Sequence, residues 1–150
     1  MQNSWLVLSC LGLTIVSALV PWINAEVILL SFVAQAPSPA AVIGFIVVAT
    51  VGQMVGKCLL YWTSRRTLQH RFKSGRVAAS FERLRTDLAG HPRRAVGMVL
   101  LSSSVGLPPF YLVTIAAGTL RVNFRLFVAA GGVGRLVRFA AIGLAARLAL

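Results

Sequence analysis

The apolar segments of this chain are too unequal in length to form a simple bundle of membrane-spanning helices. Residues 40–62 and 126–146 are each long enough to cross the hydrocarbon core as a helix, which takes about 20 residues. The other apolar segments are shorter, at 4–20, 25–36, 95–104 and 110–120. Because the bilayer offers no water to an exposed backbone, short segments must bend within protein or around a wet cavity. The lengths therefore predict two full spans and several interrupted helices.

The composition of the chain indicates a membrane protein. Hydrophobic residues make up 57% of the chain and charged residues only 12%, whereas a soluble domain needs a much more polar surface. The formal net charge of +12 would suit nucleic acid or anionic lipid. The positive-inside rule explains the same excess, and no aromatic platform for nucleic acid accompanies the charges. We therefore expect membrane lipids as partners, and no nucleic acid.

Prolines break two of the apolar regions, at Val20-Pro21 and at Leu107-Pro108-Pro109. A proline removes a backbone donor and disfavours helix in the residue before it, so the chain must bend. We expect Pro21, Pro108 and Pro109 to mark the tips of two re-entrant hairpins that face one interior site.

The two halves of the chain follow the same plan. Ser17-Ala-Leu-Val-Pro21 aligns with Ser104-Val-Gly-Leu-Pro108, and a long helix with glycines follows in each half. Paired interrupted segments indicate an inverted-repeat transporter. The expected fold is all-α integral membrane, with two inverted repeats, each a Pro-broken re-entrant helical hairpin followed by a transmembrane helix. The boundaries of this single domain (1–150) are 1–62 for the first repeat, 63–94 for a basic loop and 95–150 for the second repeat.

Basic residues are concentrated between the halves. Residues 65–94 hold nine Lys or Arg against two acids, whereas residues 35–40 hold no charge. Since basic loops remain cytoplasmic, loop 63–94 is expected in the cytoplasm of a multi-pass protein of the inner (plasma) membrane. A second hairpin that enters from the cytoplasm also returns Arg121 and Arg125 there. A continuous span kinked at the prolines would leave them outside, so the hairpin is favoured.

Within this loop, residues 77–89 have apolar side chains at helical spacing, namely Val77, Phe81, Leu84 and Leu88. The pattern predicts an amphipathic helix that lies on the headgroups and ends at Gly90. The arginines expected to contact anionic lipid are Arg65, Arg76, Arg83 and Arg85.

Two arginines, Arg135 and Arg138, lie in the middle of the last span. An arginine at the bilayer midplane costs at least ~2.5–3.5 kcal/mol, so it usually faces a partner, a cavity or water. Glu26 is the only acid outside the basic loop, and a buried carboxyl group without a partner takes up a proton. Glu26 is therefore either an interfacial residue or a proton-titrating carboxylate that pairs with one arginine and leaves the other to an anion.

Other polar residues near the predicted interior have two interpretations. Gln53 makes either a helix–helix hydrogen bond or a substrate contact, and Lys57 is expected to extend to the cytoplasmic surface. Four hydroxyl groups either cap the broken second hairpin or bind phosphate: Ser102, Ser103, Ser104 and Thr114. The residues predicted for substrate binding and transport are Glu26, Gln53, Ser103, Thr114, Arg135 and Arg138.

A catalytic site would need a nucleophile and a base close together. Both histidines, His70 and His91, lie in the basic loop, and no metal-ligand spacing exists. We therefore expect a non-enzyme without metal or cofactor. Three functions remain: a translocator of lipid or lipid phosphate, a structural or assembly membrane protein with internal salt bridges, and a proton-coupled carrier of a small anion. The oligomeric state is left open, a homo-oligomer included.

Four motifs in a fixed order resemble the DedA/VTT-domain (SNARE-associated) membrane proteins. They are Pro21-Trp-Ile-Asn-Ala-Glu26, Gly52-x-x-x-Gly56-x-x-x-x-Tyr61-x-x-x-Arg65, Leu107-Pro-Pro-Phe-Tyr-x-x-x-x-Ala-Ala-Gly118 and Phe127-x-x-x-Gly131. The resemblance covers roughly residues 17–143. It implies two re-entrant hairpins in inverted repeat. It also implies lipid movement across the membrane: flipping of polyprenyl phosphate or phospholipid in bacterial members and scrambling in eukaryotic relatives, with proton dependence in some.

By this resemblance, Glu26 matches the acidic residue of the first hairpin, and Pro108 and Pro109 match the break of the second. Arg65 matches the basic residue that ends the Gly-x-x-x-Gly helix, although Ser64 stands where Gly is usual. Many members carry an arginine shortly before the second-hairpin prolines, where this chain has Ser102-Ser-Ser104. Either Arg135 or Arg138 supplies that charge from the last helix, or this branch works differently.

Overall fold

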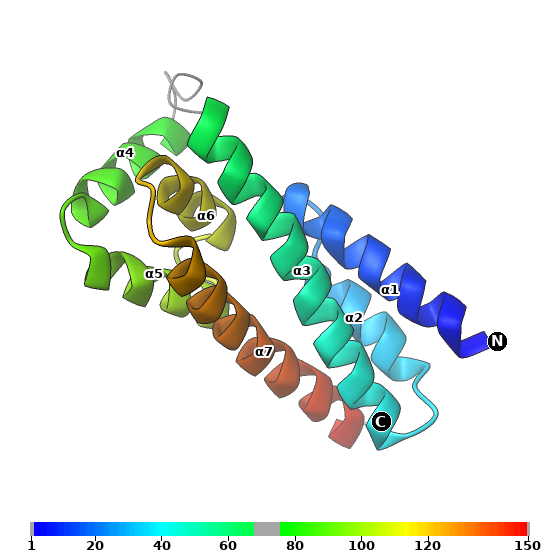
Figure 1. Cartoon of the computed structure of the whole chain (residues 1–150). Helices are drawn as coiled ribbons and strands as arrows, with labels where there is room; N and C mark the ends of the chain where they lie inside the picture. Colours follow the sequence, from blue (N-terminus) through cyan, green and yellow to red (C-terminus); the bar gives the residue numbers. More distant parts are fainter. Residues whose placement is uncertain (1, 68–75, 150) are drawn as a thin grey trace. The chain divides into compact units, whose positions relative to one another are not determined.

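The computed structural model describes residues 2–67 and 76–149, without the side chains of residues 2, 3, 67, 76–78, 80 and 81. This described part of the chain forms seven α-helices and no strand (Figure 1). The helices are α1 Gln2–Leu19, α2 Ala25–Ala34, α3 Pro39–Thr67, α4 Arg76–Leu88, α5 Pro92–Val105, α6 Phe110–Thr119 and α7 Phe124–Ala149. The predicted all-α class is therefore confirmed, and each predicted apolar segment corresponds to one helix.

The helices divide into two compact units. Unit 1 comprises Met1–Gly56 and Arg135–Leu150, and unit 2 comprises Lys57–Gly134. Unit 1 holds α1 and α2, whereas unit 2 holds α4, α5 and α6. Helices α3 and α7 each contribute one part to either unit, so the units differ from the expected repeats.

Helices α3 and α7 are long and apolar enough to cross a membrane. The candidate spans are Pro39–Arg66, with 28 residues, and Phe124–Ala149, with 26 residues. At about 1.5 Å per residue each helix is roughly 40 Å long, which exceeds the ~30 Å of the hydrocarbon core. Both helices include the spans predicted from the sequence and extend them at each end.

In unit 1, α1 and α2 form a hairpin around Pro21. Helix α1 ends at Leu19, shortly before this proline. Helix α2 follows Asn24, whose side chain accepts a hydrogen bond from the Glu26 backbone N–H at 2.9 Å. The two helices contact one another. Leu6 near the start of α1 and Pro37 just beyond α2 line the same apolar pocket, so the open ends of the hairpin lie together.

Small residues allow α3 to approach α1 closely within unit 1. A Cβ atom on Gly52 would lie 2.9 Å from the Leu11 carbonyl oxygen, and one on Gly56 would lie 2.8 Å from the Ile15 carbonyl oxygen. Both positions therefore need glycine, as expected for close helix packing. The buried core of this unit consists of Cys10, Ala25, Leu29, Phe32, Val33, Ala36, Val42, Phe45, Ile46, Ala49 and Phe139.

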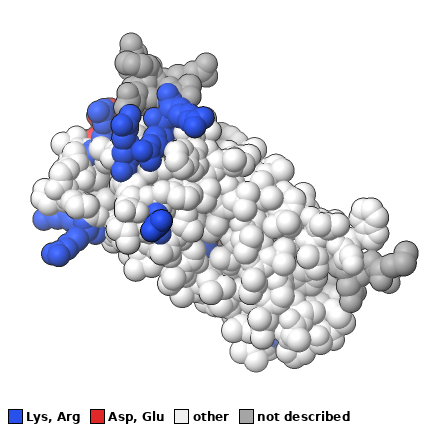
Figure 2. Space-filling model, in the orientation of Figure 1, with Lys and Arg blue, Asp and Glu red and all other residues white. Residues whose placement is uncertain are grey.

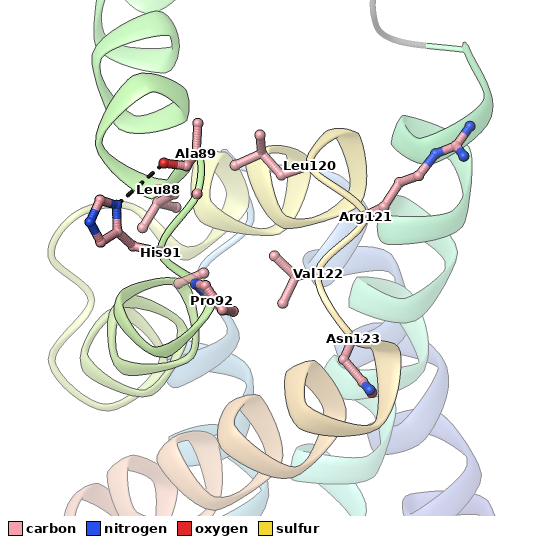
Figure 3. Close-up of a pocket in the computed structure, with 10 residues that line it drawn as sticks. Leu88, Ala89, His91, Pro92, Leu120, Arg121, Val122 and Asn123 are labelled. Atoms are coloured by element: carbon pink, nitrogen blue, oxygen red, sulfur yellow. Dashed lines mark hydrogen bonds between the residues drawn. The ribbon is translucent and has the colours of Figure 1, made fainter.

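In unit 2, α5 and α6 form a second hairpin and contact one another. Gly106 ends α5 in the left-handed conformation, with φ 88°, and its N–H donates to the Ser102 carbonyl. Helix α6 then begins directly after Pro109. The start of α5 at Pro92 and the end of α6 at Leu120 line the same pocket (Figure 3). The open ends of this hairpin also lie together.

The second part of α3 packs within unit 2 through Tyr61. The Tyr61 ring stacks on Phe127 of α7, with centroids 5.0 Å apart. Its hydroxyl donates a hydrogen bond to the carbonyl of Val122, in the turn between α6 and α7. This contact holds the end of α3 beside the open end of the second hairpin.

Helix α4, Arg76–Leu88, confirms the helix predicted at residues 77–89, and its location on the headgroups stays a prediction. The helix contacts α5 and α6, and Leu84 and Leu88 are buried. The side chains of Val77 and Phe81 lie outside the described ones. Leu84 and Leu88, the described part of the apolar face, are therefore buried within unit 2, where α4 contacts α5 and α6.

Candidate functional site

The Glu26 carboxylate and the Arg138 guanidinium form an ion pair in unit 1. Arg138 Nε donates to Glu26 Oε1 at 2.6 Å, and Arg138 Nη2 contacts the same oxygen. The two side chains are only 27% and 22% exposed. Glu26 lies in the first turn of α2, after the Asn24 cap, and Arg138 extends from α7. Arg138, one of the two central arginines expected to face Glu26, thus bonds to it.

Arg135 lies one turn before Arg138 on α7. Its guanidinium carbon is 5.7 Å from the centroid of the buried Phe139 ring, which is a cation–π distance. The charges of Glu26 and Arg138 both act on Arg135. Two positive groups and one negative group therefore occupy one partly buried region, so this cluster carries a net charge of +1. That charge suits an anion.

Gln53 joins α3 to α1 in unit 1. Its side-chain amide donates to the Ser17 hydroxyl at 2.6 Å and to the Thr14 carbonyl at 3.1 Å. Gln53 is 2% exposed. The helix–helix hydrogen bond proposed for this residue is therefore present, and its contact with a substrate stays a prediction.

Each of the four hydroxyl groups of the second hairpin donates to a backbone carbonyl of unit 2. The four are Ser102, Ser103, Ser104 and Thr114. The Ser102 hydroxyl bonds across the break to the Pro108 carbonyl, and the Ser103 hydroxyl also reaches the Ala130 carbonyl of α7 at 3.3 Å. These bonds satisfy carbonyls near the bend. Binding of a phosphate by Ser103 or Thr114 stays a prediction.

Lys57 corrects the expectation that its side chain reaches the cytoplasmic surface. It is 4% exposed, and its Nζ lies 5.7 Å from the Phe110 ring centroid and 5.4 Å from the Tyr111 centroid. The two rings begin α6, directly after the proline break, and their faces attract the ammonium group. Lys57 is therefore held inside unit 2.

The predicted lipid-surface arginines are mostly exposed on unit 2, where basic side chains gather near α4 and the end of α3 (Figure 2). Arg83 is exposed, and Arg85 is also exposed with an ion pair to Glu82 at 3.3 Å. Arg65 is partly covered by Trp62, whose ring centroid is 5.3 Å from the guanidinium carbon. The side chain of Arg76 lies outside the described residues.

Among the contributors to these sites that were not predicted from the sequence are Asn24, Phe139 and Tyr111. Asn24 precedes a helix that begins at an apolar run and has the residue type of an N-cap, so it was detectable. Phe139 follows Arg135 by four positions, which places both on one helix face. Tyr111 gave no such signal, because it meets Lys57 only through the folded chain.

In a comparison with known protein families, residues 14–147 match the VTT domain. No curated protein and no solved structure matches the chain. The matched residues include both proline breaks and the Glu26–Arg138 ion pair. They also include the whole of the first candidate span, Pro39–Arg66, and the second span, Phe124–Ala149, up to residue 147. This chain therefore belongs to the VTT-domain family and is a membrane protein.

Proposed function

We propose that this protein translocates a lipid or a polyprenyl phosphate across a bacterial inner membrane, by flipping or scrambling, and is neither an enzyme nor dependent on a cofactor. The observation that carries the proposal is the cluster of Arg135, Arg138 and Glu26. Charged groups are rare within apolar helices and usually have a function there. The net positive charge of this cluster suits a phosphate headgroup.

Arginine suits a phosphate because its planar guanidinium donates two parallel hydrogen bonds and stays charged when partly buried. In the protein without substrate, the Arg138 guanidinium is hydrogen-bonded to the Glu26 carboxylate. An incoming phosphate would compete with that carboxylate, and the released Glu26 could then bind a proton. Such an exchange would couple lipid movement to protons without a covalent step.

We also propose that the hairpins α1–α2 and α5–α6 are re-entrant and form inverted repeats. The pockets at the open ends of each hairpin support this, because a chain that enters and leaves on one side must bring those ends together. With native cysteines replaced, Ser38→Cys should react with an impermeant maleimide from outside the cell. Asn123→Cys should react only from the cytoplasm, and external labelling of Asn123→Cys would contradict the second hairpin.

The test of function is reconstitution of the full chain into liposomes with fluorescent phospholipid or fluorescent polyprenyl phosphate. Loss of fluorescence to an external quencher then measures translocation. We expect Glu26→Gln, Arg135→Gln and Arg138→Gln each to slow translocation at least tenfold. Arg147→Gln is the matched control, since Arg147 is an exposed arginine on the same helix. Normal rates in all three variants would contradict the proposal.

A structural or assembly role is the second candidate. It is favoured by one observation: Gln53, Ser103 and Thr114 all hydrogen-bond to the protein itself. Under that role, the three charge variants would fail to accumulate in the membrane. The wild-type protein would not translocate lipid in liposomes.

A further inference from the structure

The open end of the second hairpin contains a hollow of about 240 Å³, between the α4–α5 turn and the α6–α7 turn. At about 30 Å³ per water molecule, this volume would accommodate a group the size of a phosphate with its ester linkage. The hollow lies entirely within unit 2. The Glu26–Arg138 ion pair belongs to unit 1, so the hollow shares no residue with it.

The walls of this hollow are apolar and its rim is polar. Leu88 and Ala95 are buried in its wall, and Val122 is partly buried there. In Figure 3, Val122 extends into the space opposite Leu88, whereas His91 and Arg121 turn outward. His91 and Asn123 are exposed at the rim. An apolar wall with a polar rim fits the junction between a headgroup and its acyl chains.

Arginines lie close in sequence to the lining residues. Arg121 itself lines the hollow, Arg93 and Arg94 directly follow Pro92, and Arg125 lies two positions after Asn123; all four are exposed. The nearest acid in sequence is Asp87 on α4, and Glu82 of the same helix is already paired with Arg85. The described rim therefore has a clear excess of positive charge, which a cytoplasmic membrane surface would present to anionic lipid.

The N-termini of two helices add to the positive charge near the hollow. Helices α5 and α7 both begin at the hollow, and the first turn of neither contains an acid. A helix N-terminus carries a partial positive charge, and Arg93, Arg94 and Arg125 lie in these first turns. Repulsion between these charges would be relieved by an anion.

We propose that this hollow binds the phosphate headgroup of an anionic lipid at the cytoplasmic surface, with the acyl chains leaving along its apolar wall. This lipid site is additional to the translocation cluster and does not depend on it. The phosphate chemistry is shared with a free phosphate ion, so the test must separate the two.

Binding can be measured by native mass spectrometry of the full chain in neutral detergent. The probes are dioctanoyl phosphatidic acid, dioctanoyl phosphatidylcholine and inorganic phosphate. We expect phosphatidic acid to bind at least tenfold more tightly than either other probe. Equal binding of inorganic phosphate would overturn the lipid assignment, and equal binding of phosphatidylcholine would overturn the anionic one.

Two variants test the location. The triple variant Arg93→Gln, Arg94→Gln, Arg125→Gln should weaken phosphatidic acid binding at least tenfold. Its matched control is Arg66→Gln, Arg83→Gln, Arg147→Gln, which removes the same charge from exposed positions that neither line the hollow nor directly adjoin its lining residues in sequence. An equal loss of binding in the control would show that binding depends only on the total positive charge of the protein, and it would overturn the site.

The second variant, Ala89→Trp, fills the mouth of the hollow without changing charge, since Ala89 is an exposed lining residue. We expect it to weaken binding at least tenfold, and unchanged binding would overturn a cavity site. In the double variant Glu26→Gln, Arg138→Gln, any phosphatidic acid bound at the translocation cluster should be lost, whereas the binding that Ala89→Trp removes should remain. Failure of the translocation proposal is thus distinguishable from failure of this one.

Discussion

Arg138 Nε lies 2.6 Å from Glu26 Oε1, although 112 positions separate the two residues in the chain. This bond joins the first turn of α2 to the middle of α7 within unit 1. Both side chains are largely shielded, so neither charge is fully solvated when its partner is removed. The energetics of the pair can therefore be measured separately from its proposed function.

Removal of one partner should destabilise the protein more than removal of both. We expect Glu26→Gln or Arg138→Gln to lower the free energy of unfolding by roughly 1–3 kcal/mol, between the values for exposed and buried pairs. The double variant should cost less than the sum, because it leaves no isolated charge from this pair. Chemical unfolding in detergent measures all three variants, and strictly additive losses would show that the pair is not coupled.

Close packing of α1 on α3 gives a second prediction. Gly52→Ala and Gly56→Ala should each lower stability by about 1–3 kcal/mol, because the new methyl groups meet backbone carbonyls that cannot move independently. Gly44→Ala on the same helix is the control, since a Cβ there has no neighbour within 4 Å. It should be neutral or stabilise by up to about 1 kcal/mol through helix propensity. Thermal unfolding in detergent distinguishes these results, and equal effects at all three positions would contradict the packing argument.

The position of Lys57 over two aromatic rings gives a third prediction. Tyr111→Leu should lower stability by about 0.5–2 kcal/mol beyond the loss of packing, because it removes one π face from the ammonium. The control is the same substitution in a Lys57→Met background, where no ammonium remains. A double-mutant cycle from chemical unfolding measures the difference. If Tyr111→Leu costs the same in both backgrounds, the ring does not stabilise the charge.

The elements that local sequence determines were predicted well. Pro21 follows the end of α1 at Leu19, and the Pro108–Pro109 pair lies between α5 and α6. A proline disfavours helix in the residue before it, so both bends were correctly located. The pairing of Glu26 with a central arginine also followed from the sequence, because no other acid exists outside the basic loop. The hydrogen bond between Arg138 and Glu26 in particular could not be predicted, since Arg135 and Arg138 lie on the same side of α7.

Features that depend on distant packing were predicted less well. Lys57 was expected at the surface because a lysine near a helix end commonly extends there, whereas rings more than fifty positions later hold it inside. The packing of the apolar face of α4 could not be predicted, because its periodicity is the same for a lipid-bound and a protein-bound helix. Only the contacts with α5 and α6 distinguish the two cases.

The last prediction concerns Arg121, which has a left-handed backbone conformation with φ 54°. It follows α6 in a Schellman motif, in which the Val122 N–H donates to the Ala117 carbonyl at 3.0 Å and the Arg121 N–H donates to the Gly118 carbonyl at 3.1 Å. A residue with a Cβ pays roughly 1–2 kcal/mol for this conformation, and glycine avoids that penalty.

Arg121→Gly should therefore raise the free energy of unfolding by about 0.5–1 kcal/mol, after the greater entropy of glycine in the unfolded chain is subtracted. Arg121→Ala is the control, because it removes the same charge and side chain but keeps the Cβ atom. Chemical unfolding in detergent at high salt, which screens the neighbouring arginines, should show Arg121→Gly to be the more stable of the two. Equal stability of both variants would mean that the gain comes from the lost charge and not from the backbone.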